Sequence, residues 1–457
     1  MSNAKKDDKF SLKAVVNMKK RKVLFAEVDS AFADVLLSFL TLPLGTIVKI
    51  LKKRSKDLDL HIGSLTSLYT GLANLDSDRF LTEGAKSVLL HPRSSSGDER
   101  QTLKLDISDY PPLEYFNCSK KCISYVGVRS MIMYYDVGYC VYCRQKMEKV
   151  VQSETRTVPC DDEVYLKKKT SSFLITDDLR IMPNSGLLQI SSLLGDADLV
   201  EAETMTVSFG LSEVMDLLLY SLLSINPLSV AILSAKIEFT KATEFTTYAS
   251  DNCMMGLKLI VQKSTSKLLY AEAEEDFVDF LFSFLVIPLG GVESLLWSNS
   301  YVKAIDNLHK STTDLIREKY FKSSDTKNRL LKPNIPHGYK SKNHILPLTE
   351  DQLPIVNGSV NWLAPSTKFP KGQGSYLVGP RTYKVTDDLT VTPFCTLSIL
   401  ETLVKMKIPV SDVEELKLDI GTNKGLSILR ASLTSKCALT DALLTPILKA
   451  RQKKQKV

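Results

Sequence analysis

The chain has 457 residues, of which 44% are hydrophobic and 24% are charged, and its formal net charge is +7. This is the composition of an ordinary soluble globular protein that is long enough for two or three domains. The charge is modest for this length, and much of it sits in short runs such as 19–22 and 449–456, so it identifies no class of partner.

The sequence predicts neither a leader peptide nor a membrane span. Residues 1–6 are polar and charged, and patterned sequence begins near Phe10. The longest apolar stretches, 35–48 and 217–235, are interrupted by polar residues, Pro or Gly and are at or below the length that spans a bilayer. We therefore expect a protein of the cytoplasm or nucleus, in which its eight cysteines are reduced.

The N-terminal part predicts a β-hairpin followed by a helix. Two short apolar segments, 12–17 and 23–28, flank a Lys-rich turn, as the strands of a hairpin do. Apolar residues then recur at the spacing of one helix face. They are Phe32, Val35, Leu36, Phe39 and Leu40. Pro43 and Gly45 should end or kink this helix before a second one that runs through Leu51.

The same pattern recurs later in the chain. Residues 12–45 align without a gap on residues 257–290, an offset of 245, and Phe277, Phe280 and Leu281 repeat the apolar helix face. Further along, 176–179 matches 386–389 as Thr-Asp-Asp-Leu. A repeat of this length is domain-sized, so we expect each copy to form a lobe that buries its own core.

The remaining elements complete the predicted architecture. Residues 173–182 and 383–392 are typical of strand pairs around an Asp-Asp turn, and a helical pattern follows each of them, at 187–194 and 397–404. We predict an α/β or α+β fold of two tandem homologous lobes, each a β-hairpin followed by helices and further mixed strands and helices. The predicted organisation is a first lobe at 10–235 with an insertion at 113–150, a linker at 236–255, a second lobe at 256–448 and a basic tail at 449–457.

These residues carry a resemblance to a known family. The segment from Leu12 to Thr46, Leu-Leu-His-Pro at 89–92, and the Thr-Asp-Asp-Leu segments after Ile175 and Val385 resemble a plant family known as domain of unknown function 674. The resemblance covers nearly the whole chain. It implies no reaction, substrate or cofactor.

Four cysteines suggest a zinc knuckle in the first repeat. Cys118 and Cys122 are separated by three residues, and Cys140 and Cys143 by two, with seventeen residues between the pairs. Two close pairs can hold one zinc ion at about 2.3 Å from each sulfur, although the usual first spacing is two residues, and four thiols without metal are the alternative. The resembled family often carries a Cys pair followed by Cys-x-x-Cys here, which implies the same ligand role for these four. The second repeat has no cysteine in the corresponding interval, so the site belongs to the first repeat alone.

Carboxylates are the other chemical groups that both repeats share. Glu27 matches Glu272, Asp34 matches Asp279, and the Asp-Asp pairs at 177–178 and 387–388 match each other. Such groups can do acid/base work or bind a metal. We favour structural roles, with the Asp pairs at exposed turns and Asp34 on the polar side of its helix.

The sequence supports one functional hypothesis and leaves two alternatives. It contains no dinucleotide glycine motif, nucleophile elbow or zinc-protease helix. We therefore expect a non-catalytic binding or regulatory protein with structural zinc. Its partner is expected to be another protein. The alternatives are a small-molecule enzyme with carboxylates in a cleft, and a nucleic-acid-binding protein that uses the cysteine region and nearby Lys and Arg.

Overall fold

The structure is a computed structural model of the full chain. The residues that it describes are 8–54, 60–81, 83–108, 115–117, 132–133, 143, 145, 149–151, 164–167, 172–186, 201–238, 255–317, 320–336, 339–351, 355–356, 359–360 and 374–455.

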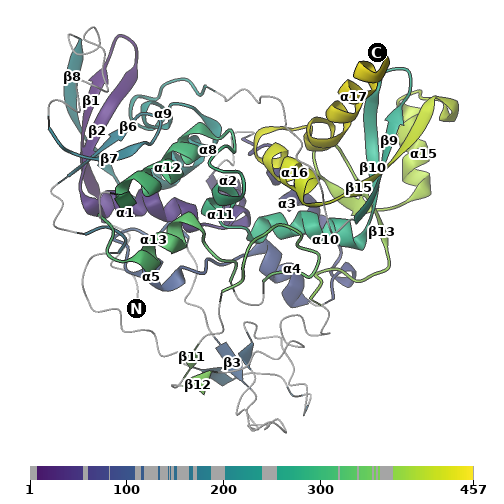
Figure 1. The fold of residues 1–457 in the computed structure, drawn as a ribbon, viewed down its shortest axis with the longest axis horizontal. Coiled ribbons are helices and arrows are strands. Elements are labelled where there is room, and N and C mark those ends of the chain that lie inside the picture. Colours follow the sequence, from purple (N-terminus) through teal and green to yellow (C-terminus); the bar gives the residue numbers. More distant parts are fainter. Residues whose placement is uncertain are drawn as a thin grey trace.

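Two five-stranded sheets of the same topology stand at opposite sides of the molecule (Figure 1). The first has the order β7-β6-β2-β1-β8, with β1 at Phe10–Asn17, β2 at Lys22–Val28, β6 at Phe173–Thr176, β7 at Ile181–Pro183 and β8 at Ala202–Phe209. The second has the order β14-β13-β10-β9-β15, with β9 at Met255–Gln262, β10 at Lys267–Glu274, β13 at Thr382–Val385, β14 at Val391–Pro393 and β15 at Val413–Ile420. All strand pairs in both sheets are antiparallel, so the fold is α+β.

Helices pack against and between the two sheets. In the first repeat they are α1 (Ser30–Ser38), η1 (Phe39–Thr41), α2 (Leu44–Arg54), α3 (Leu65–Asn74), η2 (Ser77–Arg79), α4 (Glu83–Leu90), α5 (Gly97–Gln101), α8 (Leu211–Leu223) and α9 (Pro227–Leu233). In the second they are α10 (Glu275–Ser283), η3 (Phe284–Val286), α11 (Leu289–Leu295), α12 (Lys303–Arg317), α13 (Ser324–Leu331), α15 (Thr396–Lys405), η4 (Val410–Asp412), α16 (Thr422–Thr434), η5 (Thr440–Leu444) and α17 (Thr445–Gln455). Two small sheets, one of β3 (Tyr115–Asn117), β4 (Ile132–Met133) and β5 (Lys149–Val151) and one of β11 (Ile355–Val356) and β12 (Ser359–Val360), complete the described elements.

The two hairpins agree residue by residue. Lys13 lies opposite Glu27 across β1 and β2, and Lys258 lies opposite Glu272 across β9 and β10. The register of each hairpin shifts at the corresponding place, and the turn residue Arg21 has φ 48° where Ser266 has φ 55°. The predicted hairpin, the helix after it and the break before α2 are therefore present in both repeats.

The repeats exchange helices. Helix α12 of the second repeat packs against β7, α8 and α1 of the first, whereas α3 of the first repeat packs against β14 and α10 of the second. Figure 1 shows the exchange by colour, because green α12 lies beside the first sheet and blue α3 lies on the side of the second. Each sheet is thus covered in part by a helix from the other half of the chain.

The exchange is centred on two equivalent Pro residues. Pro43 and Pro288 form an isolated antiparallel bridge, in which Leu44 N–H donates to Ile287 O (3.0 Å) and Leu289 N–H donates to Leu42 O (2.9 Å). Each bond is the counterpart of the other in the repeat alignment. The two bonds are therefore related by an approximate local two-fold axis that passes between the repeats.

Glycine is needed beside this axis. A Cβ atom on Gly45 would lie 3.1 Å from Leu285 O, and one on Gly290 would lie 3.0 Å from Leu40 O. Each Cβ would also meet its own repeat, Pro92 Cγ at 2.8 Å for Gly45 and Leu330 O at 2.6 Å for Gly290, so a side chain at either position would disturb packing within and between the repeats.

One continuous core follows from the exchange. Buried side chains from both repeats form a single cluster, in which Phe39 and Phe284 have no exposed surface. The sequence predicts that each repeat buries a core of its own, and here the structure differs. The reason is that each sheet obtains part of its helical cover from the other repeat, which the repeat period alone does not reveal.

Cutting the chain between the repeats should leave them together. We expect a protein with an introduced protease site within residues 239–254 to remain one particle after cleavage, because both fragments share one core. Its thermal unfolding should be a single transition whose midpoint rises with protein concentration, since unfolding now separates two chains. Size-exclusion chromatography of the cleaved protein that yields two separate fragments would contradict this architecture.

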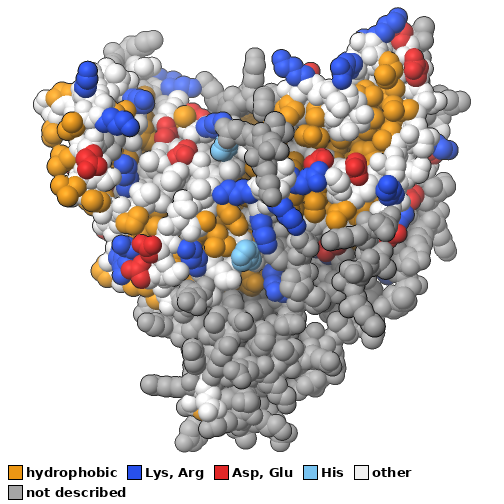
Figure 2. Space-filling model, turned by 180° about the vertical axis from the view of Figure 1, so that it is seen from behind, with side chains coloured by type: hydrophobic (Ala, Val, Ile, Leu, Met, Phe, Trp, Pro, Cys, Tyr) orange, Lys and Arg blue, Asp and Glu red, His pale blue; other side chains and the backbone are white. Residues whose placement is uncertain are grey.

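The outer side of the second sheet has a helix of its own. Ile399 and Leu403 of α15 pack on Ile260 and Tyr270 of the sheet. The other side of α15 exposes apolar residues, among them Leu397 at 71% and Val404 at 76%, and hydrophobic side chains line the corresponding edge at the left of Figure 2. No helix in the described part of the chain is both long and apolar enough to cross a membrane.

Candidate functional site

The carboxylates shared by the first helices are buried. Asp34 is 3% exposed and accepts a bond from Leu166 N–H at 2.9 Å, and burial raises its pKa to about 7. Asp279 has no exposed surface, and its Oδ1 accepts bonds from the N–H groups of Tyr376 (2.6 Å) and Leu377 (3.2 Å). The prediction that Asp34 lies on the polar side of its helix is wrong, because each Asp faces an incoming segment whose amides it binds.

These two aspartates support the exchange. Leu166, which Asp34 binds, bridges to Phe321 of the second repeat, and Leu377, which Asp279 binds, bridges to Phe80 of the first repeat. Both carboxylates therefore hold a segment that connects the repeats, and this confirms their structural role.

The Asp-Asp pairs also have structural partners. Asp177 accepts bonds from the N–H (2.8 Å) and Oγ–H (2.6 Å) of Ser229 in α9, and Asp387 accepts the same two bonds from Thr440 (2.8 and 2.7 Å). Asp177 is only 7% exposed, so the prediction of an exposed turn is wrong for this residue. The turn is covered because the helix that it anchors folds back over it.

The other matched pair of carboxylates does not join these turns. Glu27 Oε1 accepts a bond from Asn184 Nδ2 at 3.2 Å, and Glu272 Oε2 lies 3.6 Å from Lys258 Nζ. Neither glutamate lines the cleft beside the first Asp pair.

A cleft with a volume of about 820 Å³ opens beside the first Asp pair. The residues that line it come from the hairpin turn, the Asp turn, the chain around α9 and the start of α12. They are Lys20, Arg21, Lys22, Leu24, Thr176, Asp177, Asp178, Ile225, Asn226, Ser234, Ala235, Lys236, Glu238 and Lys303. Lys303 belongs to the second repeat, Lys236 and Glu238 to the start of the predicted linker, and all the others to the first repeat, so the helix exchange completes the cleft.

Cations outnumber carboxylates in the cleft by five to three. Asp177 is occupied by Ser229, and Asp178 Oδ2 lies 3.1 Å from Lys303 Nζ. Burial raises the pKa of Asp177, whereas for Asp178 the opposing effect of hydrogen bonds from Thr176 and Lys303 outweighs burial and holds its pKa below the usual value. The Arg21 guanidinium donates to the carbonyls of Leu233 (2.8 Å) and Ser234 (3.0 Å), which fixes the end of α9 at the cleft.

Comparison with known families identifies the chain. The model of a family described as "Protein of unknown function (DUF674)" matches residues 6–423 and, in a second match, residues 379–457. The chain belongs to this family. No curated protein and no solved structure matches it. The DUF674 matches run through both repeats and include every residue that lines the cleft.

Most of the predicted zinc site lies outside the described residues. This is so for Cys118, Cys122 and Cys140, whereas Cys143 is described and partly exposed. In this DUF674 chain the strand Tyr115–Asn117, which directly precedes Cys118, pairs with β5, which begins at Lys149. Among the described residues, no group of three or more His, Cys, Asp or Glu side chains is placed to hold a metal ion.

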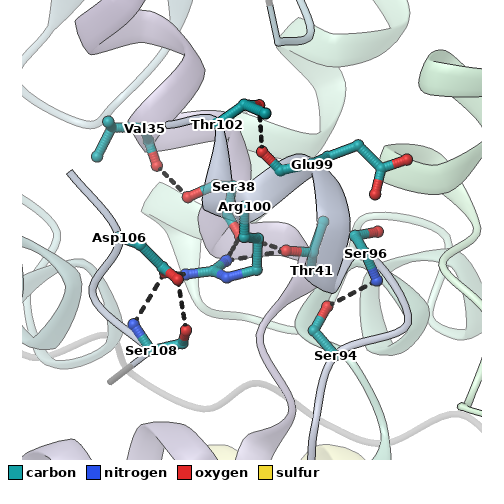
Figure 3. Close-up of polar contacts among 10 residues, drawn as sticks. All are labelled: Val35, Ser38, Thr41, Ser94, Ser96, Glu99, Arg100, Thr102, Asp106 and Ser108. Carbon is teal, nitrogen blue, oxygen red and sulfur yellow. Dashed lines mark hydrogen bonds and ion pairs between the residues drawn. The ribbon is translucent and has the colours of Figure 1, made fainter. Parts of the chain in front are cut away.

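A buried arginine organises the first repeat of the DUF674 fold. Figure 3 shows Arg100 of α5 reaching the end of α1, where its Nη1 donates to Ser38 O (2.9 Å) and Thr41 Oγ1 (3.0 Å), while Nη2 donates to Asp106 (2.6 Å). Burial alone would raise the pKa of Asp106, but Arg100 and hydrogen bonds from Ser108 hold it below its usual value. The side chain of Arg100 is 2% exposed and that of Asp106 is 24% exposed, so this ion pair is a partly buried structural link.

Sequence reasoning missed the cleft and the buried arginine. The run 19–22 is visible in the sequence, but only the structure brings it next to Lys236 and Lys303. Arg100 has no counterpart of the same type in the second repeat, where Ser283 Oγ, the equivalent of Ser38, bonds with His344 Nδ1 at 2.8 Å. One feature of the sequence could have indicated the cleft. The hairpin turn is strongly basic in the first repeat, whereas the aligned turn of the second repeat is mostly neutral.

Proposed function

We propose that this protein is a non-catalytic binding protein of the plant cytoplasm or nucleus that binds a small anionic ligand in the cleft. The observation that carries the proposal is the excess of five cationic side chains over three carboxylates around the cleft, where Asp177 is bound by Ser229 and Asp178 pairs with Lys303, one of the five cations. A cleft of this size is typical of small-molecule sites. Lys and Arg are the side chains that recognise phosphate and carboxylate groups.

The proposal favours binding over catalysis for a specific reason. Asp177 is bound by Ser229 of α9, and Asp387 is bound in the same way by Thr440 of η5. The shared structural contact explains why an Asp is present at this position in both repeats, without a catalytic role. The enzyme alternative would require Asp177 to leave Ser229 in order to act as a base.

Anions should stabilise the protein through the cleft. We expect phosphate or citrate, compared with chloride at equal ionic strength, to raise the melting temperature by about 2 °C or more, because a ligand that binds only the folded state stabilises it. The double variant Lys22→Gln/Lys303→Gln should lose this rise. Lys267→Gln, at the matching turn position of the second repeat, is the control and should keep it. An equal rise in the double variant would contradict the proposed site.

Nucleic-acid binding is a second candidate, favoured by the surface. Figure 2 shows Lys and Arg side chains gathered along the middle of one face, and α2, which ends in Lys52, Lys53 and Arg54, lies in the middle of the molecule (Figure 1). This candidate requires affinity for single-stranded RNA that falls steeply with salt. Fluorescence anisotropy with a labelled RNA at two salt concentrations would show it, and affinity that is absent or unaffected by salt would exclude it.

We also propose that the four predicted cysteines hold one structural zinc ion. Their spacing supports this, and so does the pairing of β3 with β5, because Asn117 lies opposite Lys149 and brings the chain next to Cys118 close to the chain after Cys143. In this proposal a protein partner docks on the zinc-bound insertion, which gives the regulatory role expected from the sequence.

Metal analysis tests the zinc proposal. We expect one zinc per chain in protein purified without added metal, and loss of that zinc in Cys140→Ser, because a tetrahedral site needs all four ligands. Cys437→Ser is the control, since Cys437 is an exposed cysteine of the second repeat, and it should retain the metal. Zinc-free wild-type protein, or a Cys140→Ser variant with full zinc, would refute the proposal.

A further inference from the structure

The backbone of the hairpin turn does not require the cations that the turn carries in the first repeat. The hairpin turns of the two repeats have the same backbone, with Arg21 at φ 48° and Ser266 at φ 55°. Yet Thr265 and Ser266 in the second repeat occupy the positions of Lys20 and Arg21 in the first. The same turn therefore forms with two fewer cations, although Arg21 also holds the end of α9 in the first repeat.

The chain after the helix that each Asp turn binds, α9 in the first repeat and η5 in the second, also differs between the repeats. In the first repeat α9 ends at Leu233, and Ser234 turns the chain into a left-handed conformation with φ 50°. In the second repeat the corresponding helix continues directly into α17. The early end of α9 places Lys236 on the wall of the cleft, so a second element adds positive charge to that of the turn.

A third element supplies the remaining cation. Lys303 is the first residue of α12, a helix of 15 residues that comes from the second repeat. The positive end of a helix dipole adds to the attraction for an anion near its first turn. The cations thus reach the cleft from the hairpin turn, from the chain after α9 and from the start of α12.

From this arrangement, and resting on the proposed binding function, we infer that the ligand carries two or more phosphate groups on a polar skeleton without an aromatic ring. One phosphate group contacts only part of a cleft of about 820 Å³, whereas several groups can reach cations on three elements at once. Because separate elements of the cleft each supply cations, we expect the ligand to carry more than one anionic group.

The rest of the lining describes the skeleton. No aromatic side chain is among the described residues that line the cleft, and the apolar ones are Leu24, Ile225 and Ala235. A nucleotide base would find no ring to stack on. Thr176 and Asn226 offer hydrogen bonds that suit the hydroxyl groups of a sugar or polyol.

Isothermal titration calorimetry of the full chain tests this inference. The probes are inositol hexakisphosphate, ATP and inorganic phosphate, and we expect the first to bind at least roughly tenfold more tightly than the other two. Lys22→Gln and Lys303→Gln should each weaken its binding by roughly tenfold, as expected for the loss of a charge-assisted contact. Lys267→Gln should leave it unchanged.

The outcomes separate the ligand class from the binding function. Tighter binding of ATP than of inositol hexakisphosphate would overturn the non-aromatic skeleton and leave anion binding in place. Equal binding of inorganic phosphate would overturn the requirement for several phosphate groups. If none of the three binds and no anion stabilises the fold, both the inference and the proposed function fail.

The same chemistry can come from a free metabolite or from a lipid headgroup. Inositol trisphosphate in solution is compared with phosphatidylcholine vesicles that contain phosphatidylinositol bisphosphate. Binding of the soluble probe alone identifies a free ligand, and binding that requires the vesicle identifies a headgroup. Lys303→Gln should weaken whichever binding is seen, and a variant that binds as well as the wild type would overturn the site.

Discussion

Replacing Arg100 with Met should lower the free energy of unfolding by about 3 kcal/mol, because a partly buried ion pair is broken and two buried acceptors lose their donor. The methionine fills much of the same space, but Asp106 loses its cation, and Ser38 O and Thr41 lose their buried donor. The loss should appear as a lower midpoint in urea without a change in the cleft, whose lining does not include Arg100.

An exposed ion pair provides the control for this prediction. Arg54 pairs with Asp216 at 2.6 Å, but about a third of each side chain is exposed, so Arg54→Met should cost less than about 1 kcal/mol. Because the pKa of Asp106 is held below its usual value, the stability from its pair is present above about pH 4 and is lost as the pH falls further. The difference between wild type and Arg100→Met should therefore shrink in strong acid. Equal losses in the two variants at neutral pH would show that burial of Arg100 has no energetic consequence.

The sequence predicts the local elements of this fold well. The ungapped match of 12–45 with 257–290 fixes the hairpin and helix of both repeats, and the structure confirms them at β1, β2 and α1 and at β9, β10 and α10. The strand pairs around the Asp-Asp turns and the helix at 397–404 are also confirmed, as β6–β7, β13–β14 and α15, whereas the helix predicted at 187–194 lies outside the described residues. These features depend on residues close together in the chain, and periodicity reveals such features directly.

Long-range arrangement is what the sequence could not supply. Helices α3 and α12 have the same apolar pattern whichever sheet they cover, so nothing in either helix shows that it crosses to the other repeat. The burial of Asp34 is hidden for a related reason. Its partner Leu166 lies 132 residues away, and without that partner a carboxylate on an apolar helix is most simply placed in solvent.

The candidate site illustrates the same limit. A turn with Lys20, Arg21 and Lys22 is indistinguishable in sequence from any solvated basic turn. Its meaning depends on Lys236 and Lys303, which join it only through the end of α9 and through the helix exchange. The two aligned turns share a backbone and differ in charge, and only their surroundings give that difference a role.

Asp279 holds the segment of Leu377, which bridges to Phe80 of the first repeat. Its Oδ2 accepts bonds from Ser341 Oγ and from Asn343 Nδ2, while its Oδ1 holds the amides of Tyr376 and Leu377. Asp279→Ala leaves these donors without a partner in the core, so the free energy of unfolding should fall by about 3 kcal/mol or more. Asp279→Asn keeps one oxygen for the two amides and should lose about 1 kcal/mol or less at pH 4.

The pH dependence of these variants gives the sharper test. Burial raises the pKa of Asp279 to about 6 in the folded protein, above the usual 3.8. A raised folded pKa stabilises the fold while the group is protonated, so this stability is full below about pH 4 and is lost as the pH rises through 6. A shift of this size corresponds to about 3 kcal/mol, and Asp279→Asn, which cannot ionise, should gain that much on the wild type between pH 4 and pH 7. Urea unfolding of both proteins across this range measures the gain. Parallel stability curves would mean that Asp279 stays ionised in the folded state, with its four donors compensating fully for burial.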